Sequence, residues 1–303
     1  MARLEIGRSL SVVGLAGQHS EDFYIRAFRA SGGTADMTAG LIAHFDGSSF
    51  ELIREFDEEI TGIAYSDRMG LICLGELGAL HLFHNGFWSQ ISDEAKPRAR
   101  LNDIVITGGR IFGLAWRANL FEHDPTNGWK LHSLAGPRSK VRLLGIAATG
   151  EEEFVVCGSR GFLKEGPLGG LTTVDVPASA DITDVATNGT DVVAVGSSGL
   201  GLHRSAVGDW EVLDRGDESE NLVGVTIYSD KFLVAGRTNI LKVEGNRFEI
   251  LYRMPSTIIA NIGGTLFNLG FGRLHRLDGD TWTPIPVLLE TPDRGPFAAR
   301  RKS

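Results

Sequence analysis

The most constraining feature of this sequence is a unit of about 40 residues that recurs along nearly the whole chain. One column of the repeat holds a Trp, Phe or Leu just after a turn that contains Gly or Asn. Its members are Phe50, Trp88, Trp129, Leu171, Trp210, Phe248 and Trp282. Successive members are 34 to 42 residues apart. A period of this length indicates a tandem array of small supersecondary units.

A second column has the same period and falls inside apolar runs. Its residues are small or short, and they are Gly14, Gly62, Asp103, Gly145, Asp184, Gly224 and Ala260. The first interval is the longest, and it contains the polar insertion at residues 31–34. Two independent columns with one period are difficult to obtain by chance, so the repeat divides the chain into seven units.

A third signal is a short reversal midway through each unit, between two apolar stretches. The reversals lie at residues 75–78, 115–118, 158–161, 196–199, 236–239 and, in shortened form, 270–272. Gly or Asn at the end of such a turn is expected to supply the positive φ that a tight hairpin needs. Each unit then divides into four short strands, which in the fifth unit are 182–187, 191–195, 199–204 and 210–213.

These units predict an all-β fold, a seven-bladed β-propeller of four-stranded antiparallel blades. The pattern resembles the broad β-propeller class over about residues 9–290. The Gly-His and Trp-Asp marks of the Trp-Asp repeat family do not recur. The segment Leu277-Asp278-Gly279-Asp280-Thr281-Trp282 resembles the Asp box of sialidases and sortilin-like proteins, but it lacks one residue between Asp and Gly. The resemblance therefore implies the fold and none of those families' activities.

We predict a single domain at residues 1–290 and a disordered tail at 291–303. The predicted blades are 9–54, 58–93, 100–134, 140–176, 181–214, 221–252 and 256–288. The opening residues 1–6 are candidates to extend the last blade.

Charge and cysteine content narrow the classes of partner and compartment. The formal net charge is −8, which opposes general binding to nucleic acid or to an anionic membrane. Cys73 and Cys157 both lie in apolar runs, where a reduced cysteine acts as a small hydrophobe. The apolar stretch 10–16 is needed as a strand, and no stretch is long enough to span a membrane. We predict no signal peptide and a cytoplasmic location.

No strong catalytic, phosphate-binding or metal-binding motif occurs, and we predict no cofactor and no metal. His81 and His84 are three apart on a predicted strand, so they point to opposite faces and do not share an ion. Asp103 and Asp184 interrupt a column of Gly and Ala on the innermost strands. With Arg142 they form an alternative site in the central channel, although carboxylates there also serve simply as solvated or turn-capping groups.

The stronger functional signal comes from topology. In a propeller, the turns between second and third strands share one face with the connections between blades. Arg and aromatic residues gather on this face, and they are Trp116, Arg117, Arg160, Arg237, Phe271, Arg273, Arg98 and Arg138. Arg and Trp dominate binding hot spots. Polar loops without a function would show a similar composition.

The sequence leaves three functions open. The first is a non-enzymatic protein-binding module that uses the Arg- and Trp-bearing face, in a narrower form an intracellular inhibitor or immunity-type protein. The second is an enzyme or small-ligand, glycan-type binder that uses the channel. The third is a nucleic-acid binder on the basic rim, which the acidic net charge opposes. The identity of the partner protein is not encoded in any motif.

Overall fold

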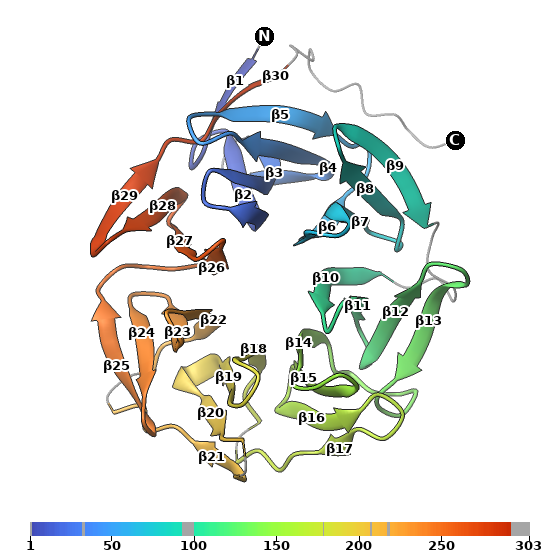
Figure 1. The fold of residues 1–303 in the computed structure, drawn as a ribbon, viewed down its shortest axis with the longest axis vertical. Coiled ribbons are helices and arrows are strands. Elements are labelled where there is room, and N and C mark those ends of the chain that lie inside the picture. The colour runs from blue at the N-terminus through green and yellow to red at the C-terminus, as the bar shows by residue number, and fades with distance from the viewer. Residues whose placement is uncertain are drawn as a thin grey trace.

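The chain forms a ring of seven four-stranded antiparallel sheets, as predicted (Figure 1). The computed structural model describes residues 2–31, 34–92, 100–177, 179–206, 208–216 and 219–291. In each blade the strands follow one another outward from the axis in chain order. Within these residues the only helical segment is the single 3-10 turn η1 (Ser197–Gly199), and no helix is long and apolar enough to cross a membrane.

The strand bounds follow the repeat. Blade 1 contains β2 (Leu10–His19), β3 (Asp22–Ser31), β4 (Thr34–Phe45) and β5 (Phe50–Glu55). Blade 2 contains β6 (Ile60–Ser66), β7 (Gly70–Gly75), β8 (Leu80–His84) and β9 (Phe87–Ser92). Blade 3 contains β10 (Leu101–Thr107), β11 (Arg110–Ala115), β12 (Asn119–Asp124) and β13 (Gly128–Ser133). Blade 4 contains β14 (Leu143–Ala148), β15 (Glu153–Gly158), β16 (Phe162–Pro167) and β17 (Thr172–Thr173).

The remaining blades are built in the same way. Blade 5 contains β18 (Ile182–Thr187), β19 (Val192–Gly196), β20 (Gly201–Arg204) and β21 (Trp210–Val212). Blade 6 contains β22 (Leu222–Tyr228), β23 (Lys231–Gly236), β24 (Ile240–Glu244) and β25 (Arg247–Tyr252). Blade 7 contains β26 (Ile258–Ile262), β27 (Thr265–Gly270), β28 (Arg273–Asp278) and β29 (Thr281–Ile285).

The hydrophobic core is divided among the interfaces between blades. Each of seven buried clusters joins the facing sides of two neighbouring blades. Most of the second strands are apolar on both faces because each contributes to two clusters, and every residue of β7 is buried. The aromatic column seals these interfaces: the indole N–H of Trp129 in blade 3 donates to the Gly78 carbonyl of blade 2 at 2.7 Å. Cys73 and Cys157 are buried free thiols.

The column of small residues has a specific backbone role. In blades 1 to 6 it follows a β-bulge in the first strand, as between Ile60 and Gly62 and between Ile182 and Asp184. The bulge leaves one extra residue unpaired and bends the strand where the blades crowd the axis. Blade 7 has no bulge, and its Ala260 pairs directly with Phe267.

The first and last described strands pair outside the seven sheets. β1 (Ala2–Glu5) pairs with β30 (Leu288–Thr291) in an antiparallel ribbon beside β5 (Figure 1). Leu4 and Leu289 are buried in the cluster that joins blades 7 and 1. Residues 2–6 therefore do not extend the last blade, which already has four strands of its own. Thr291, predicted as the start of the tail, pairs with Ala2, and residues 292–303 lie outside the described residues.

Candidate functional site

The loop face is the face that carries the turns between second and third strands and the connections between blades. Backbone hydrogen bonds attach each of several turns to the entry of the following blade. The N–H of Ala118 donates to the Val141 carbonyl (2.9 Å), and the N–H of Gly161 donates to the Ala180 carbonyl (2.8 Å). The N–H of Gly199 reaches the carbonyl of Glu220 at 2.7 Å in the same way. This repeated attachment fixes the direction in which the turns project their side chains.

Three of these turns hold a large, exposed side chain in left-handed backbone. The φ angles are +64° at Arg117, +64° at Arg160 and +48° at Phe271, and each residue is followed by a second residue of positive φ. Two consecutive positive φ angles define the type I′ hairpin turn, in which glycine is the least strained residue. Sequence reasoning expected Gly or Asn to supply the positive φ. In blade 3 Arg117 and Ala118 supply it instead, and Asn239 of blade 6 has no positive φ.

The turns of blades 3 and 4 and the connection between them form one surface, the blade 3–4 patch. Its residues are Trp116, Arg117, Arg138, Lys140, Arg142 and Arg160. Trp116 is 51% exposed and forms a backbone bridge with Arg142. The Arg142 guanidinium lies 5.6 Å from the centroid of the Trp116 ring. The backbone N–H of Arg142 is also bound by the Ser159 hydroxyl of the next turn at 2.9 Å, so the patch is continuous from blade 3 to blade 4.

The cations of this patch differ from a neighbouring cation on the same face. Arg100, in front of blade 3, is held by two carboxylates of blade 2, at 2.7 Å from Glu59 and 3.6 Å from Glu76. Among the residues that the structure describes, none of the five cations of the blade 3–4 patch forms an ion pair. Their charges therefore remain available to a ligand.

Two acidic residues of the loop face accept hydrogen bonds from turns on that face. Asp181 accepts the backbone N–H of Arg160 at 2.9 Å. Glu220 accepts the backbone N–H of Thr238 at 2.6 Å and the Asn239 amide at 3.1 Å. On the loop face, Asp181 and Glu220 therefore hold turns in place, whereas the cations of the blade 3–4 patch form no ion pair among the described residues.

The other predicted loop-face residues lie apart from the patch. Arg237 is exposed in the blade 6 turn. Phe271, 80% exposed, and Arg273 border a cleft of about 380 Å³ at the blade 7 turn, together with Pro284. Arg98 lies outside the described residues. Contacts join Trp116 to Arg142 and Arg142 to the turn that carries Arg160, and Arg138 lies in the connection between these two blades. The blade 6 and 7 residues lie in other sectors of the same face.

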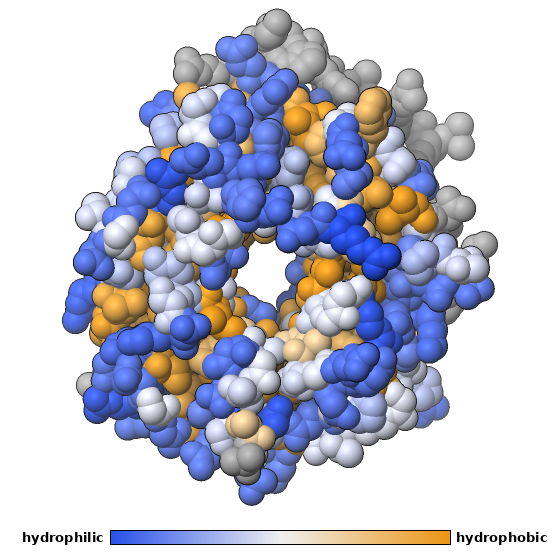
Figure 2. Space-filling view, in the orientation of Figure 1, coloured by the Kyte–Doolittle hydropathy of each residue, from blue (hydrophilic) through white to orange (hydrophobic). Residues whose placement is uncertain are grey.

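The predicted channel residues serve the ring itself. Figure 2 shows the channel open at the centre of the molecule. Asp184 accepts the N–H of Val185 (2.9 Å) and, from the next blade, the N–H of Val225 (2.9 Å). Desolvation by the surrounding blades raises the pKa of Asp184 to about 7. The two hydrogen bonds lower this pKa, and the negative charge of Asp103 raises it further. Desolvation by the surrounding blades likewise raises the pKa of Asp103, an exposed residue whose carboxylate accepts the Ile104 N–H at 2.8 Å.

Sequence reasoning missed the channel cation. Arg26 of β3 donates to the Ile60 carbonyl of blade 2 (2.6 Å) and to the Val13 carbonyl of blade 1 (3.1 Å). Its charge opposes the rise in the Asp103 pKa. Arg142, which the sequence assigned to this site, lies at the loop face against Trp116 instead. A signal was present, because the residue matching Arg26 is apolar in every other blade, for example Leu74 or Val195.

No described group of three or more His, Cys, Asp or Glu side chains is arranged to hold a metal ion. His81, considered above as half of a metal pair, lies 2.7 Å from Glu58 through its Nε2.

Comparisons with known proteins identify the architecture alone. No family model matches the chain, and no curated protein matches it. Among solved structures it is similar to YCF48 bound to D1 peptide (13% identity, TM-score 0.65, 91% of this chain and 94% of that one). It is also similar to the WD40 β-propeller domain of Doa1 (11%, TM-score 0.66, 91% and 94%). A third is virginiamycin B lyase from Staphylococcus aureus (13%, TM-score 0.62, 75% and 84%). At these identities the likeness shows the propeller fold.

Proposed function

We propose that this chain is a non-enzymatic protein-binding module that holds a partner protein on its loop face. The blade 3–4 patch makes the principal contact in this proposal. Trp116 supplies an exposed aromatic surface, and Arg117, Arg138 and Arg160 supply guanidinium groups that bind carboxylates in a two-pronged geometry.

The observation that carries the proposal is the backbone strain at three non-glycine residues in exposed turns. Left-handed backbone costs a non-glycine residue about 1–2 kcal/mol. Arg117, Arg160 and Phe271 accept this strain while their side chains project into solvent. Glycine would adopt the same backbone with less strain. Strain of this kind is typical of sites where the side chain serves a ligand.

Two further points support a protein partner. The unpaired cations of the patch are concentrated beside an aromatic ring, and this combination suits the carboxylates and apolar groups of a protein surface. YCF48, one of the similar propellers, is described as bound to a peptide. In the narrower form of the proposal, the chain is an intracellular inhibitor or immunity-type protein that masks an acidic functional surface of its partner.

The test is affinity capture from a lysate of the source cells with two matched variants. The first variant is Trp116→Ala combined with Arg117→Ala and Arg160→Ala. The control is Phe87→Ala, which removes an aromatic side chain that is 78% exposed in the third-to-fourth-strand turn of blade 2, on the opposite face. We expect one protein to be recovered equally by wild type and control, and at least about tenfold less by the triple variant. Equal recovery by all three would remove the loop face from the proposal.

A further inference from the structure

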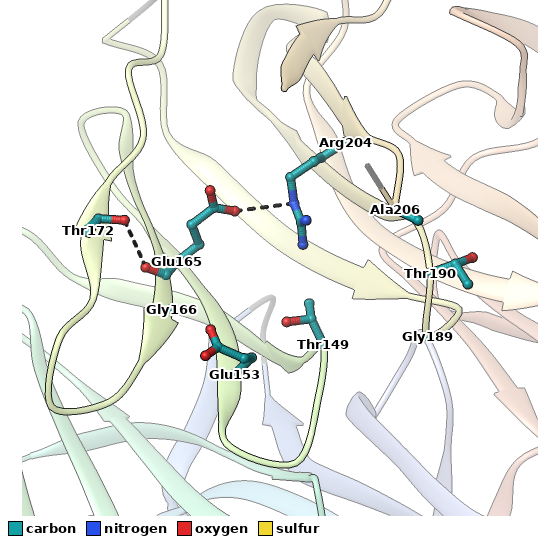
Figure 3. A pocket seen from close by; sticks show the side chains of 9 residues that line it. All are labelled: Thr149, Glu153, Glu165, Gly166, Thr172, Gly189, Thr190, Arg204 and Ala206. Carbon is teal, nitrogen blue, oxygen red and sulfur yellow. Dashed lines mark hydrogen bonds and ion pairs between the residues drawn. The ribbon is translucent and has the colours of Figure 1, made fainter. Parts of the chain in front are cut away.

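The turn face is the face opposite the loop face, and it carries the turns between first and second strands and between third and fourth strands. It has a polar cleft between blades 4 and 5. Its volume is about 500 Å³, within the range of small-molecule sites. Blade 4 contributes Thr149, Glu153, Glu165, Gly166 and Thr172, and blade 5 contributes Gly189, Thr190, Arg204 and Ala206 (Figure 3). The cleft shares no residue with the blade 3–4 patch.

Arg204 is held in a fixed position on the blade 5 wall. Its Nε lies 3.2 Å from the Glu165 Oε2 of blade 4, and its guanidinium carbon lies 5.8 Å from the centroid of the Trp210 ring. The same Glu165 oxygen accepts the Trp210 indole N–H at 3.0 Å. The Arg204 side chain is only 20% exposed, yet its two terminal nitrogens have no partner among the described residues. Figure 3 shows them directed into the cleft.

Glu153 supplies an opposite charge from blade 4. It is exposed at the start of β15, and none of the described residues pairs with its carboxylate. Glu153 and Arg204 lie on different walls and form no ion pair within 4 Å, so each remains available to a ligand.

We propose that this cleft binds a small zwitterion of the amino-acid or short-peptide type. The ligand carboxylate accepts hydrogen bonds from the Arg204 terminal nitrogens, and its ammonium donates to Glu153. Glu165 is paired with Arg204 and accepts the Trp210 indole N–H, so it orients the guanidinium instead of competing for the ligand. Thr190 and Thr172 donate their hydroxyl protons to Asn188 and to the Glu165 carbonyl, which leaves their oxygens as acceptors for ligand N–H groups.

Calorimetric titration with alanyl-alanine tests the proposal directly. N-acetyl-alanyl-alanine lacks the ammonium, and alanyl-alanine amide lacks the carboxylate. L-alanine distinguishes a single amino acid from a peptide. We expect millimolar binding of at least one zwitterion, and at least about tenfold weaker binding of each capped dipeptide. Absence of binding by both zwitterions, or equal binding of the capped forms, would overturn the proposal.

Variants locate the site. Glu153→Gln and Arg204→Gln are each expected to weaken binding at least about tenfold. The matched control is Glu151→Gln, which removes the same charge from the same connection outside the cleft. Since Arg204→Gln also disturbs Trp210, its folding is checked by circular dichroism, and Glu153→Gln alone is sufficient for the test. Unchanged affinity in Glu153→Gln would contradict the site.

Discussion

The channel and the blade 3–4 patch both contain polar side chains, but they use them in opposite ways. In the channel, Asp184 and Arg26 bind backbone groups across the gap between adjacent blades. In the patch, backbone groups of the turns are already bound by the connection to the following blade, and the cationic ends form no ion pair among the described residues. A polar group in the channel therefore contributes to closing the ring, whereas one in the patch is available for binding.

This comparison separates two signals that look alike in sequence. Asp103 departs from a column of small residues, and Trp116 is a large aromatic residue within a short turn, so both stand out in the repeat. The structure shows that the irregular carboxylate is a substitute for missing strand pairing at a bulge. A side chain at Gly62 would begin only 2.6 Å from Asp103 Oδ1, so the glycine of one blade makes room for the carboxylate of the next.

The largest effect on stability is expected from removing the hydrogen-bond acceptor Asp184 from the channel. Asp184→Ala leaves the N–H groups of Val185 and Val225 without their acceptor, and it should lower the free energy of unfolding by about 2 kcal/mol at pH 5.5. Urea unfolding followed by tryptophan fluorescence measures the change. Asp209→Ala, at an exposed position, is the control and should change stability by less than about 0.5 kcal/mol. Equal effects of the two variants would contradict the claim that the channel carboxylate stabilises the ring more than an exposed carboxylate does.

The same residue should give stability a defined pH dependence. The pKa of Asp184 is raised in the folded state, so the folded protein holds a proton that the unfolded chain has lost. Its contribution to stability is therefore fully present below the ordinary Asp pKa of about 4 and is lost as pH rises from there to about 7. The difference between wild type and Asp184→Ala should shrink over this window, by at most about 1.4 kcal/mol per pH unit. A difference that stays constant from pH 5 to pH 8 would show that this carboxylate does not titrate there.

The smallest expected effect is an increase in stability, and it comes from a substitution in the blade 3–4 patch. Arg160→Gly should raise the free energy of unfolding by about 1 kcal/mol, because glycine adopts the left-handed backbone without strain. Arg237→Gly is the matched control on the same face, because Arg237 is not left-handed, and glycine there should lower stability slightly. Differential scanning calorimetry compares the two. Stabilisation by both variants, or by neither, would contradict the assignment of strain to Arg160.

The repeat made the fold predictable because each column has one physical cause. Small residues recur at the bulged first strands, and aromatic residues such as Trp129 recur where the outer strands seal adjacent blades. Ring closure was not predictable in the same way. β1 and β30 lie outside the period, and their pairing depends on burial of Leu4 and Leu289 at the seam.

The candidate site was only partly predictable. The topology placed Trp116 and Arg160 on one face, but the left-handed backbone of Arg117 and Arg160 has no local signature, because arginine is an unusual residue in such a turn. Arg142 was assigned to the channel because it directly precedes the innermost strand β14. Being one residue outside that strand, it belongs to the loop face. The cleft of Figure 3 joins residues from two blades, which no local motif encodes.

The most direct test of the central claim is hydrogen–deuterium exchange on the complex with the captured partner. We predict that protection on binding is concentrated at residues 115–119, 136–142 and 158–161, which carry the blade 3–4 patch. Protection confined to the turn face or to the channel strands, with unchanged exchange in those three segments, would contradict the claim that the loop face binds the partner.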